Sequence, residues 1–208
     1  MRFLDRQDAG RRLAAALGAL APVDPVLLAL PRGGVPVACE IALALGAPLD
    51  ILAVRKLGAP GNPEFGVGAI AEGGIVTIND EVAQRVGLTG AVLEEAIERE
   101  RAELDRRVAR YRGERPRLAL SGATAVLVDD GVATGITEVA AIRAARACGA
   151  TRVIVAVPVG AHDSIRMLRG EADVVVCLIE ARRLIGVGRW YDDFRAPSDE
   201  EVVALLAN

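Results

Sequence analysis

The chain has 208 residues, of which 52% are hydrophobic and 25% are charged, with a net charge of −3. These values are typical of a soluble domain with a full core. The acidic balance and an aromatic content of only 3% argue against a nucleic-acid surface. No apolar run approaches 18 residues and the start lacks a signal-peptide core, so we expect a cytoplasmic protein without membrane contact. Three widely spaced cysteines predict reduced core thiols, with neither a disulfide framework nor a zinc site.

Helical and extended patterns alternate along the chain, which predicts an α/β fold: a parallel twisted sheet with helices on both faces. The predicted helices cover residues 5–20, 35–45, 90–112, 138–146 and 163–168, with a final helix after the Ser198-Asp199-Glu200-Glu201 cap. The predicted strands cover residues 26–30, 49–54, 125–128, 152–157 and 173–177.

Two segments in the middle of the chain show different patterns. Residues 57–74 hold six glycines and two prolines without helical periodicity, which favours a mobile loop with extended arms. A short strand and helix are expected at 77–86. The helix at 90–112 carries Glu95–Arg99 and Glu103–Arg107 at i,i+4 spacing, typical of a solvated face that could also serve self-association. Its expected inner stripe is Leu93, Ile97, Leu104, Val108 and Tyr111.

The stretch from Ala125 to Thr137 carries the clearest chemistry. Four apolar residues precede Asp129 and Asp130, and a loop with two glycines and two threonines leads into a helix. Backbone N–H groups and the positive dipole end of such a helix favour a phosphate. Adjacent carboxylates repel each other unless sugar hydroxyls or a divalent cation take up their charge or lone pairs. The pattern therefore predicts a ribose that carries a phosphate.

Other motifs fit this stretch poorly. The chain has no Gly-x-x-x-x-Gly-Lys-Ser/Thr, and Gly131 and Gly135 are spaced wrongly for Gly-x-Gly-x-x-Gly. Serine occurs only at positions 121, 164 and 198, so no Gly-x-Ser-x-Gly elbow exists. For an isolated Asp-Asp-Gly, an ordinary glycine-rich turn of a doubly wound fold is an equal alternative.

Residues 125–137 resemble the 5-phosphoribosyl-1-pyrophosphate (PRPP) loop of the type I phosphoribosyltransferases. The resemblance implies a Rossmann-like core and transfer of the phosphoribosyl group between PRPP and a nitrogenous base, purine-like by preference, with Mg²⁺ as cofactor and release of pyrophosphate. Asp129 and Asp130 would hold the ribose hydroxyls, and Asp130 would also help to bind Mg²⁺. The residues that would bind the 5′-phosphate are Gly131, Val132, Ala133, Thr134, Gly135, Ile136 and Thr137.

Two further segments resemble pyrophosphate-binding parts of this superfamily. The turn Pro31-Arg32-Gly33-Gly34 lies where the family has its pyrophosphate loop, often with a non-proline cis peptide, although a simple tight turn is an alternative. Val54-Arg55-Lys56 resembles the adenine branch, in which Arg55 and Lys56 would contact pyrophosphate, and Lys56 is the only lysine among 25 basic residues. In the same branch Glu72 would be a catalytic, proton-handling carboxylate near the base. The alternatives are that Arg55-Lys56 is only a solvated strand end and that Glu72 is only a turn residue.

The tail from Ile185 to Arg195 resembles the C-terminal hood of the hypoxanthine-guanine branch. The resemblance implies base-binding by Trp190 and Tyr191 and a contribution of Asp193 to the Mg²⁺ site, with an aromatic anchor of the tail as an equal alternative. It also implies a core over residues 1–178, with a flexible loop at 57–74 and a helical insertion at about 79–113, and a hood with the terminal helix at 179–208. A homodimer is expected.

One residue of the loop differs from the family motif, and the single histidine matches no motif. Ala133 replaces an aspartate that the hypoxanthine-guanine branch is thought to use for the purine, which leaves the acceptor open. The alternative function is a PRPP- or nucleotide-sensing regulator on the same fold, or another phosphoribosyl enzyme such as a hydrolase. Arg32, Lys56 and a lid favour an enzyme. His162, the only histidine, has no partner in any matched motif and is interpreted as a loop residue.

Overall fold

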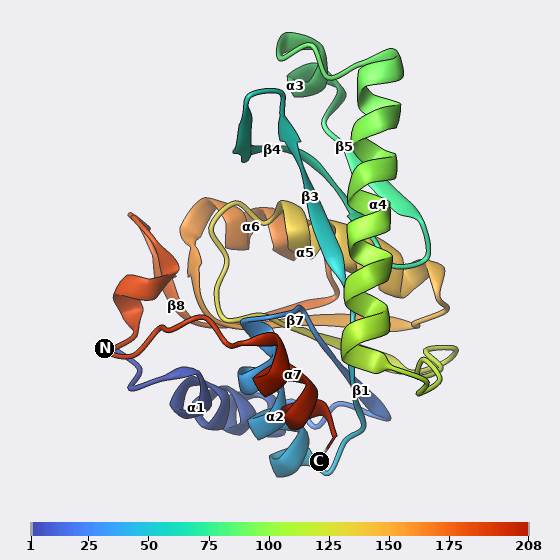
Figure 1. Ribbon diagram of the computed structural model, residues 1–208. Helices are drawn as coiled ribbons and strands as arrows, with labels where there is room; N and C mark the ends of the chain where they lie inside the picture. The colour runs from blue at the N-terminus through green and yellow to red at the C-terminus, as the bar shows by residue number, and fades with distance from the viewer. Residues whose placement is uncertain (1, 208) are drawn as a thin grey trace.

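A computed structural model of the chain describes residues 2–207, apart from the side chains of residues 63 and 64. Its centre is a five-stranded parallel sheet with the strand order β2-β1-β6-β7-β8. This confirms the α/β prediction (Figure 1). The strands are β1 (Pro25–Ala29), β2 (Leu49–Ile51), β6 (Thr124–Val128), β7 (Arg152–Ala161) and β8 (Val174–Ala181).

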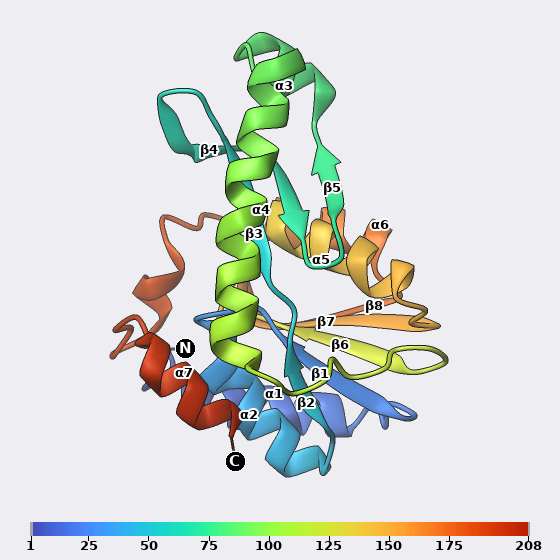
Figure 2. The ribbon, with the colours of Figure 1, turned by 45° about the vertical axis from the view of Figure 1, so that its right-hand side comes forward.

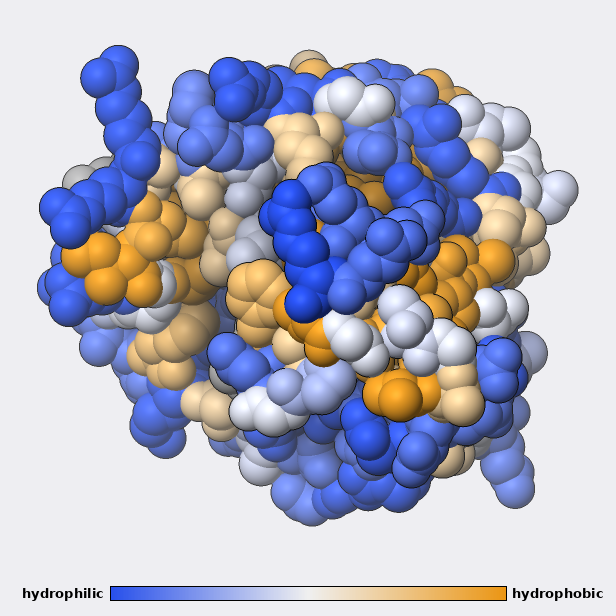
Figure 3. Space-filling view, turned by 90° about the horizontal axis from the view of Figure 1, so that it is seen from above, coloured by the Kyte–Doolittle hydropathy of each residue, from blue (hydrophilic) through white to orange (hydrophobic). Residues whose placement is uncertain are grey.

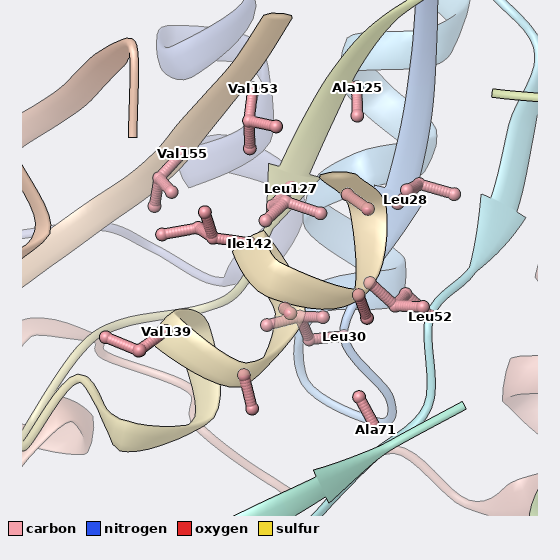
Figure 4. Close-up of a cluster of buried hydrophobic side chains, with 14 of the residues drawn as sticks. Leu28, Leu30, Leu52, Ala71, Ala125, Leu127, Val139, Ile142, Val153 and Val155 are labelled. Carbon is pink, nitrogen blue, oxygen red and sulfur yellow. The ribbon is translucent and has the colours of Figure 1, made fainter. Parts of the chain in front are cut away.

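Helices cover both faces of this sheet. On one face lie α1 (Arg6–Gly18), α2 (Gly34–Leu45) and α7 (Asp199–Leu206); on the other lie α5 (Ile136–Ala147) and α6 (His162–Glu171). Because side chains alternate along a strand, Leu28 and Leu127 point to the α5 side while Leu27 and Val126 point to the α1–α2 side. On the α5 side of the sheet, Ile142 of α5 packs with Leu127 and Val155 in one hydrophobic cluster (Figure 4). Burial of both faces explains the continuous apolar strands.

The strand register places two loops side by side at the carboxyl edge of the sheet. Ala29 at the end of β1 pairs with Val128 at the end of β6, and the Leu30 N–H donates to the Val128 carbonyl at 2.9 Å. The chain leaves β1 toward β2 on one side, whereas β6 lies on the other side. Such a switch point between neighbouring strands leaves a crevice outside their carboxyl ends. The turn at 31–34 and the loop at 129–137 therefore meet there.

The extended arms predicted at 57–74 are strands of a second, antiparallel sheet, and the mobility of this segment stays a prediction. The strands of this sheet are β3 (Val54–Ala59), β4 (Asn62–Ala71) and β5 (Ile75–Ile78), with Pro60-Gly61 as the turn of the first hairpin. Gly68 serves close strand pairing, whereas Gly61, Gly73 and Gly74 lie in turns with positive φ. A Cβ at Gly68 would lie 2.3 Å from the Thr77 carbonyl oxygen of β5.

A long helix, α4 (Gly90–Arg112), runs along this small sheet after the short helix α3 (Asp80–Arg85) (Figure 2). The predicted inner stripe is confirmed, since all five of its residues pack into apolar clusters. The Glu103–Arg107 ion pair is also confirmed, at 2.7 Å. The prediction of a Glu95–Arg99 pair is wrong, because Arg99 lies 3.5 Å from Glu100 instead.

The tail crosses back over the carboxyl edge of the sheet. A 3₁₀ turn, η1 (Val187–Trp190), precedes α7, whose predicted Ser198 cap is confirmed as a full capping box with Glu201. Helix α7 packs on α2, and the Tyr111 hydroxyl of α4 donates to Asp199 at 2.6 Å. The terminal helix thus packs on the same face of the main sheet as α1 and α2. The predicted boundary between core and hood at residue 178 remains a prediction.

All three cysteines are free thiols and partly buried, as predicted. Burial raises the pKa of both Cys39 and Cys177 to about 11. We therefore expect iodoacetamide at pH 8 to alkylate these two thiols about a hundredfold more slowly than a free thiol, because the thiolate is the reactive form. Their native alkylation rate should climb as the pH rises toward 11. Mass spectrometry checks this, with urea-unfolded protein as the control; fast native labelling of either thiol would contradict it.

Within residues 2–207, no helix is both long and apolar enough to cross a bilayer. Seen from the side of the small sheet, apolar residues form separate small patches among hydrophilic ones (Figure 3).

Candidate active site

A cleft of about 870 Å³ opens between the carboxyl edge of the main sheet and the wall made by β3 and α4. Its floor comes from Pro31, the start of β3 and the loop after β6, so the cleft joins the segments predicted to bind PRPP. The lining residues from the loop and from α5 are Asp129, Gly131, Ala133, Thr134, Gly135, Thr137 and Glu138.

The loop from Gly131 to Thr137 is held in place by its own backbone. The Val132 N–H donates to the Val159 carbonyl of β7, and the Ala161 N–H donates to the Val132 carbonyl, both at 2.9 Å. Ser164 Oγ donates to the Ala133 carbonyl at 2.7 Å. Ala133 and Thr134 are exposed at the start of α5, where unpaired N–H groups and the helix dipole favour an anion. The side chain of Val132 is fully buried, so this residue anchors the loop.

The two aspartates after β6 have different surroundings, and their joint action on a ligand stays a prediction. Asp130 accepts hydrogen bonds from Arg6 Nε at 2.8 Å and Nη2 at 2.7 Å, and Phe194 stacks on the Arg6 guanidinium at 3.9 Å. Burial raises the pKa of Asp130, and Arg6 opposes this. Asp129 lines the cleft, and burial together with the Asp130 carboxylate raises its pKa well above the usual value. Of the two aspartates, only Asp129 lines the cleft.

Glu138 is a site residue that sequence reasoning missed. It lies in the first turn of α5, is 4% exposed and lines the cleft. Burial raises its pKa to about 7, although the Lys56 ammonium opposes the rise. The sequence held a sign of this burial. Glu138 lies on the stripe of α5 that carries Ile142 and Ala145, at i+4 and i+7, where only apolar residues are expected.

The basic residues of the site differ in their availability. Lys56 is exposed toward the cleft and forms no ion pair within the described residues. Arg55 also lines the cleft but donates to Glu100 Oε2 of α4 at 3.0 and 2.8 Å. Arg32 is exposed and turns toward Asp199 of α7 at 3.5 Å. Lys56 is therefore the cation most ready to receive an anionic ligand.

The turn at 31–34 has the geometry that the resemblance implies. The Pro31–Arg32 peptide is cis, although residue 32 is not proline. Gly34 allows the turn to lie directly against the end of β6, since a Cβ there would be 2.3 Å from the Val128 carbonyl oxygen. A Cβ at Gly33 would be 2.0 Å from Asp130 Oδ2. Both glycines are required by close approach of other groups.

Glu72, expected near the base, lies elsewhere. Its carboxylate is ion-paired with Arg112 at the end of α4, through Nη1 to Oε1 and through Nη2 to Oε2 at 3.0 Å. Arg117 approaches it at 3.8 Å. Glu72 is absent from the lining of the cleft, and these contacts give it a structural role that ties the end of β4 to α4.

The tail residues predicted to bind the base and Mg²⁺ are also not in the cleft. Tyr191 is 2% exposed, its hydroxyl donates to the Asp130 carbonyl at 2.6 Å, and it packs between Phe3 and Phe194. Trp190 packs at the edge of the same cluster. The aromatic-anchor alternative therefore describes these two residues. Asp193 pairs with Arg195 at 3.1 Å in a separate groove.

His162 is the first residue of α6, which corrects its interpretation as a loop residue. Its Nδ1 lies 3.4 Å from Glu180 at the end of β8. It is half-exposed and absent from the lining of the cleft.

The parallel sheet, its switch point and the cleft beside the loop at 131–137 define the class as an α/β protein with a site at the carboxyl edge of its sheet. Comparison with known proteins makes the class specific. Residues 6–190 match the family described as phosphoribosyl transferase domain, and the chain belongs to this family of transferases.

Two similar proteins cover nearly the whole chain. A protein of Mycobacterium tuberculosis named "Putative phosphoribosyl transferase" is 48% identical over 204 residues, which are 98% of this chain and 46% of that protein. The chain thus spans about half the length of the curated relatives it matches. The crystal structure of TT1426 from Thermus thermophilus is 45% identical, with a TM-score of 0.85, and covers 99% of this chain and 98% of that one.

A more distant structure shares the fold alone. The adenine phosphoribosyl transferase of Trypanosoma brucei, in complex with AMP, pyrophosphate and ribose-5-phosphate, has a TM-score of 0.51 at 15% identity. It covers 90% of this chain and 68% of that one.

Proposed function

We propose that this protein transfers the 5-phosphoribosyl group between PRPP and a nitrogenous base, purine-like by preference, and releases pyrophosphate. The observation that carries the proposal is the convergence of Asp129, Lys56 and the anion-ready loop at 131–137 on one cleft. The alternative of a PRPP or nucleotide sensor uses the same groups for binding but makes no product.

In the proposed complex the 5′-phosphate lies on the loop, where backbone N–H groups and the hydroxyls of Thr134 and Thr137 receive it. Asp129 accepts hydrogen bonds from ribose hydroxyls. Asp130, held by Arg6, supports the loop from behind and donates no lone pair to the cleft in this arrangement.

As the C1–O bond of PRPP breaks, negative charge grows on the pyrophosphate and positive charge grows on the sugar. Lys56 and the turn at 31–34 would stabilise the leaving group, mainly by electrostatic catalysis; Lys56 and Pro31 line the cleft. Arg55 is paired with Glu100 and Arg32 with Asp199, and both carboxylates are partly buried. Bound pyrophosphate would take the place of these carboxylates as the partner of the two arginines.

Mg²⁺ remains part of the proposal, but the residues predicted to hold it do not fit. Asp130 is committed to Arg6 and Asp193 to Arg195. Within the described residues, no group of three histidine, cysteine, aspartate or glutamate side chains is arranged to hold a metal ion. A cation that arrives with PRPP would depend on the oxygens of that substrate.

The acceptor base, the homodimer, the cytoplasmic location and the lack of a nucleic-acid partner stay predictions. Incubation of the protein with labelled PRPP and a panel of purine and pyrimidine bases, with Mg²⁺ or with EDTA, tests the activity through release of pyrophosphate. Release that depends on one base supports the transferase. Tight PRPP binding without product for any base would favour the sensor.

Asp129→Asn is expected to weaken PRPP binding by about ten- to a hundredfold, because one oxygen that accepts from the ribose hydroxyls becomes an amide that cannot accept. Titration calorimetry measures this. Asp163→Asn, in an exposed pair with Arg166 on α6, is the matched control. An unchanged affinity in Asp129→Asn would remove the ligand role that we give to this side chain.

A further inference from the structure

In the part of the chain that the structure describes, all basic side chains that line the cleft lie on one wall. Arg55 and Lys56 reach the cleft from β3, and Arg99 and Arg107 reach it from α4, which runs beside β3 (Figure 2). The side made by the end of β6 and the start of α5 contributes carboxyl groups to the same lining. A second anionic group of a ligand held on the loop at 131–137 would therefore find its cations on the β3–α4 wall.

Arg99 is a cation of this wall to which the transfer chemistry described above gives no task. It shares one face of α4 with the cleft-lining residues Val92, Glu95 and Ala96, which precede it by seven, four and three positions. Its side chain is 69% exposed, and its ion pair is a loose contact of 3.5 Å between Nε and Glu100 Oε1. A guanidinium held so weakly can turn to a ligand at little cost.

Glu100 joins Arg99 to Arg55. Its Oε2 accepts hydrogen bonds from Arg55 Nε at 3.0 Å and from Arg55 Nη2 at 2.8 Å, while its Oε1 lies nearest to Arg99. The side chain of Glu100 is partly buried and lines the cleft. One carboxylate thus lies between two guanidinium groups, a position whose charge and hydrogen bonds a phosphate group would also satisfy.

We propose that Arg99 is a binding residue for the pyrophosphate group of the substrate, which it holds together with Arg55, and that Glu100 occupies this anion subsite while the cleft is empty. This inference rests on the proposed function, since it names the part of α4 that receives the leaving group. Glu100 is then an internal competitor of the ligand, and each diphosphate that binds must displace it.

The charges explain why this exchange favours the ligand. A diphosphate carries more negative charge and more acceptor oxygens than one carboxylate, so it gains more from the two arginines than Glu100 does. Removal of Arg99 takes away one of these contacts. Removal of the charge on Glu100 takes away both the competitor and a group that repels the ligand. The two substitutions should therefore act in opposite directions, which a purely structural role of the Arg55–Glu100 pair would not produce.

Arg99→Met and Glu100→Gln test the two parts of the proposal. Arg106→Met and Glu98→Gln are the matched controls, since both residues form surface ion pairs on α4 and lie outside the cleft lining. Thermal unfolding checks that each variant is folded. Titration calorimetry measures the binding of pyrophosphate and, separately, of ribose 5-phosphate, with EDTA present so that each ligand is the free anion.

We expect Arg99→Met to weaken pyrophosphate binding by about tenfold, the effect of losing a hydrogen bond between charged groups. Glu100→Gln should tighten pyrophosphate binding by about three- to fivefold, because the amide no longer competes or repels. Both controls should bind pyrophosphate as the wild type does. Binding of ribose 5-phosphate, which needs the loop and not this wall, should be the same in all variants.

The outcomes separate this inference from the proposed function. Wild-type pyrophosphate affinity in a folded Arg99→Met variant would overturn the binding role of Arg99 and leave the transferase proposal intact. Unchanged or weaker pyrophosphate binding in Glu100→Gln would overturn the role of Glu100 as competitor. Failure of the wild type to release pyrophosphate from PRPP with any base, while the variants shift pyrophosphate affinity as expected, would overturn the transferase and leave the subsite standing.

Discussion

Arg112→Met is expected to lower the free energy of unfolding by about 3–5 kcal/mol, the usual cost of removing one partner from a buried ion pair. Arg112 is 7% exposed at the end of α4, and its guanidinium binds two carboxylates at once. Nε donates to Asp50 of β2 at 3.0 Å, Nη2 donates to the Ile51 carbonyl at 2.9 Å, and both terminal nitrogens donate to Glu72.

The loss is large because the variant leaves Asp50 without its cation and leaves Glu72 with only Arg117, at 3.8 Å. Asp50 is 6% exposed and also accepts the N–H groups of Ile51 and Leu118, so it cannot turn to solvent. Methionine fills the space of the arginine stem and supplies no charge. Since Arg112 joins β2 of the main sheet to the end of β4, the variant should also loosen the attachment of the small sheet.

Urea denaturation measures the effect, with Arg106→Met as the control. Arg106 lies on the same helix but its ion pair with Glu103 is at the surface, so its loss should shift the urea midpoint far less. Adding Asp50→Asn and Glu72→Gln to Arg112→Met should recover part of the loss, because no buried charge is then unpaired. Equal effects of Arg112→Met and Arg106→Met would show that the buried cluster does not stabilise the fold.

Gly34→Ala is expected to destabilise the protein by about 3 kcal/mol and to weaken binding of ribose phosphates at the same time. The new Cβ would lie 2.3 Å from the Val128 carbonyl oxygen and 3.1 Å from the Asp129 Cα. Both are backbone atoms, so no side-chain rotation relieves the contact. The end of β6 must move away from α2, and Asp129 moves with it.

Gly170→Ala provides the matched control near the end of α6. No atom lies within 4 Å of a Cβ at that position, and its backbone is not in the left-handed region. This substitution should stabilise the protein by up to about 1 kcal/mol through the lower entropy of the unfolded chain. Urea denaturation and titration with ribose 5-phosphate test both variants. Wild-type stability and affinity in Gly34→Ala would show that the turn at 31–34 does not need its close approach to β6.

The sequence by itself determined the elements of the main sheet, the long helix at 90–112 and the main motif. Strong periodic signals, such as the apolar strand at 125–128 and the amphipathic helix at 90–112, act over a few neighbouring residues and survive in the fold. The phosphate loop is also local, since its N–H groups and glycines follow one another along the chain. The motif implied a phosphoribosyltransferase, and the chain belongs to the phosphoribosyl transferase family.

Only the tertiary structure decided the partners of each charge. Arg6 pairs with Asp130, 124 positions away, and Glu72 pairs with Arg112, 40 positions away. The glycines at 57–74 could not be assigned from sequence, because conformational freedom and close strand pairing call for the same residue. Local patterns record backbone preference, whereas the choice of ion-pair partner depends on distance in space and on burial, and both are set when the sheet and helices pack together.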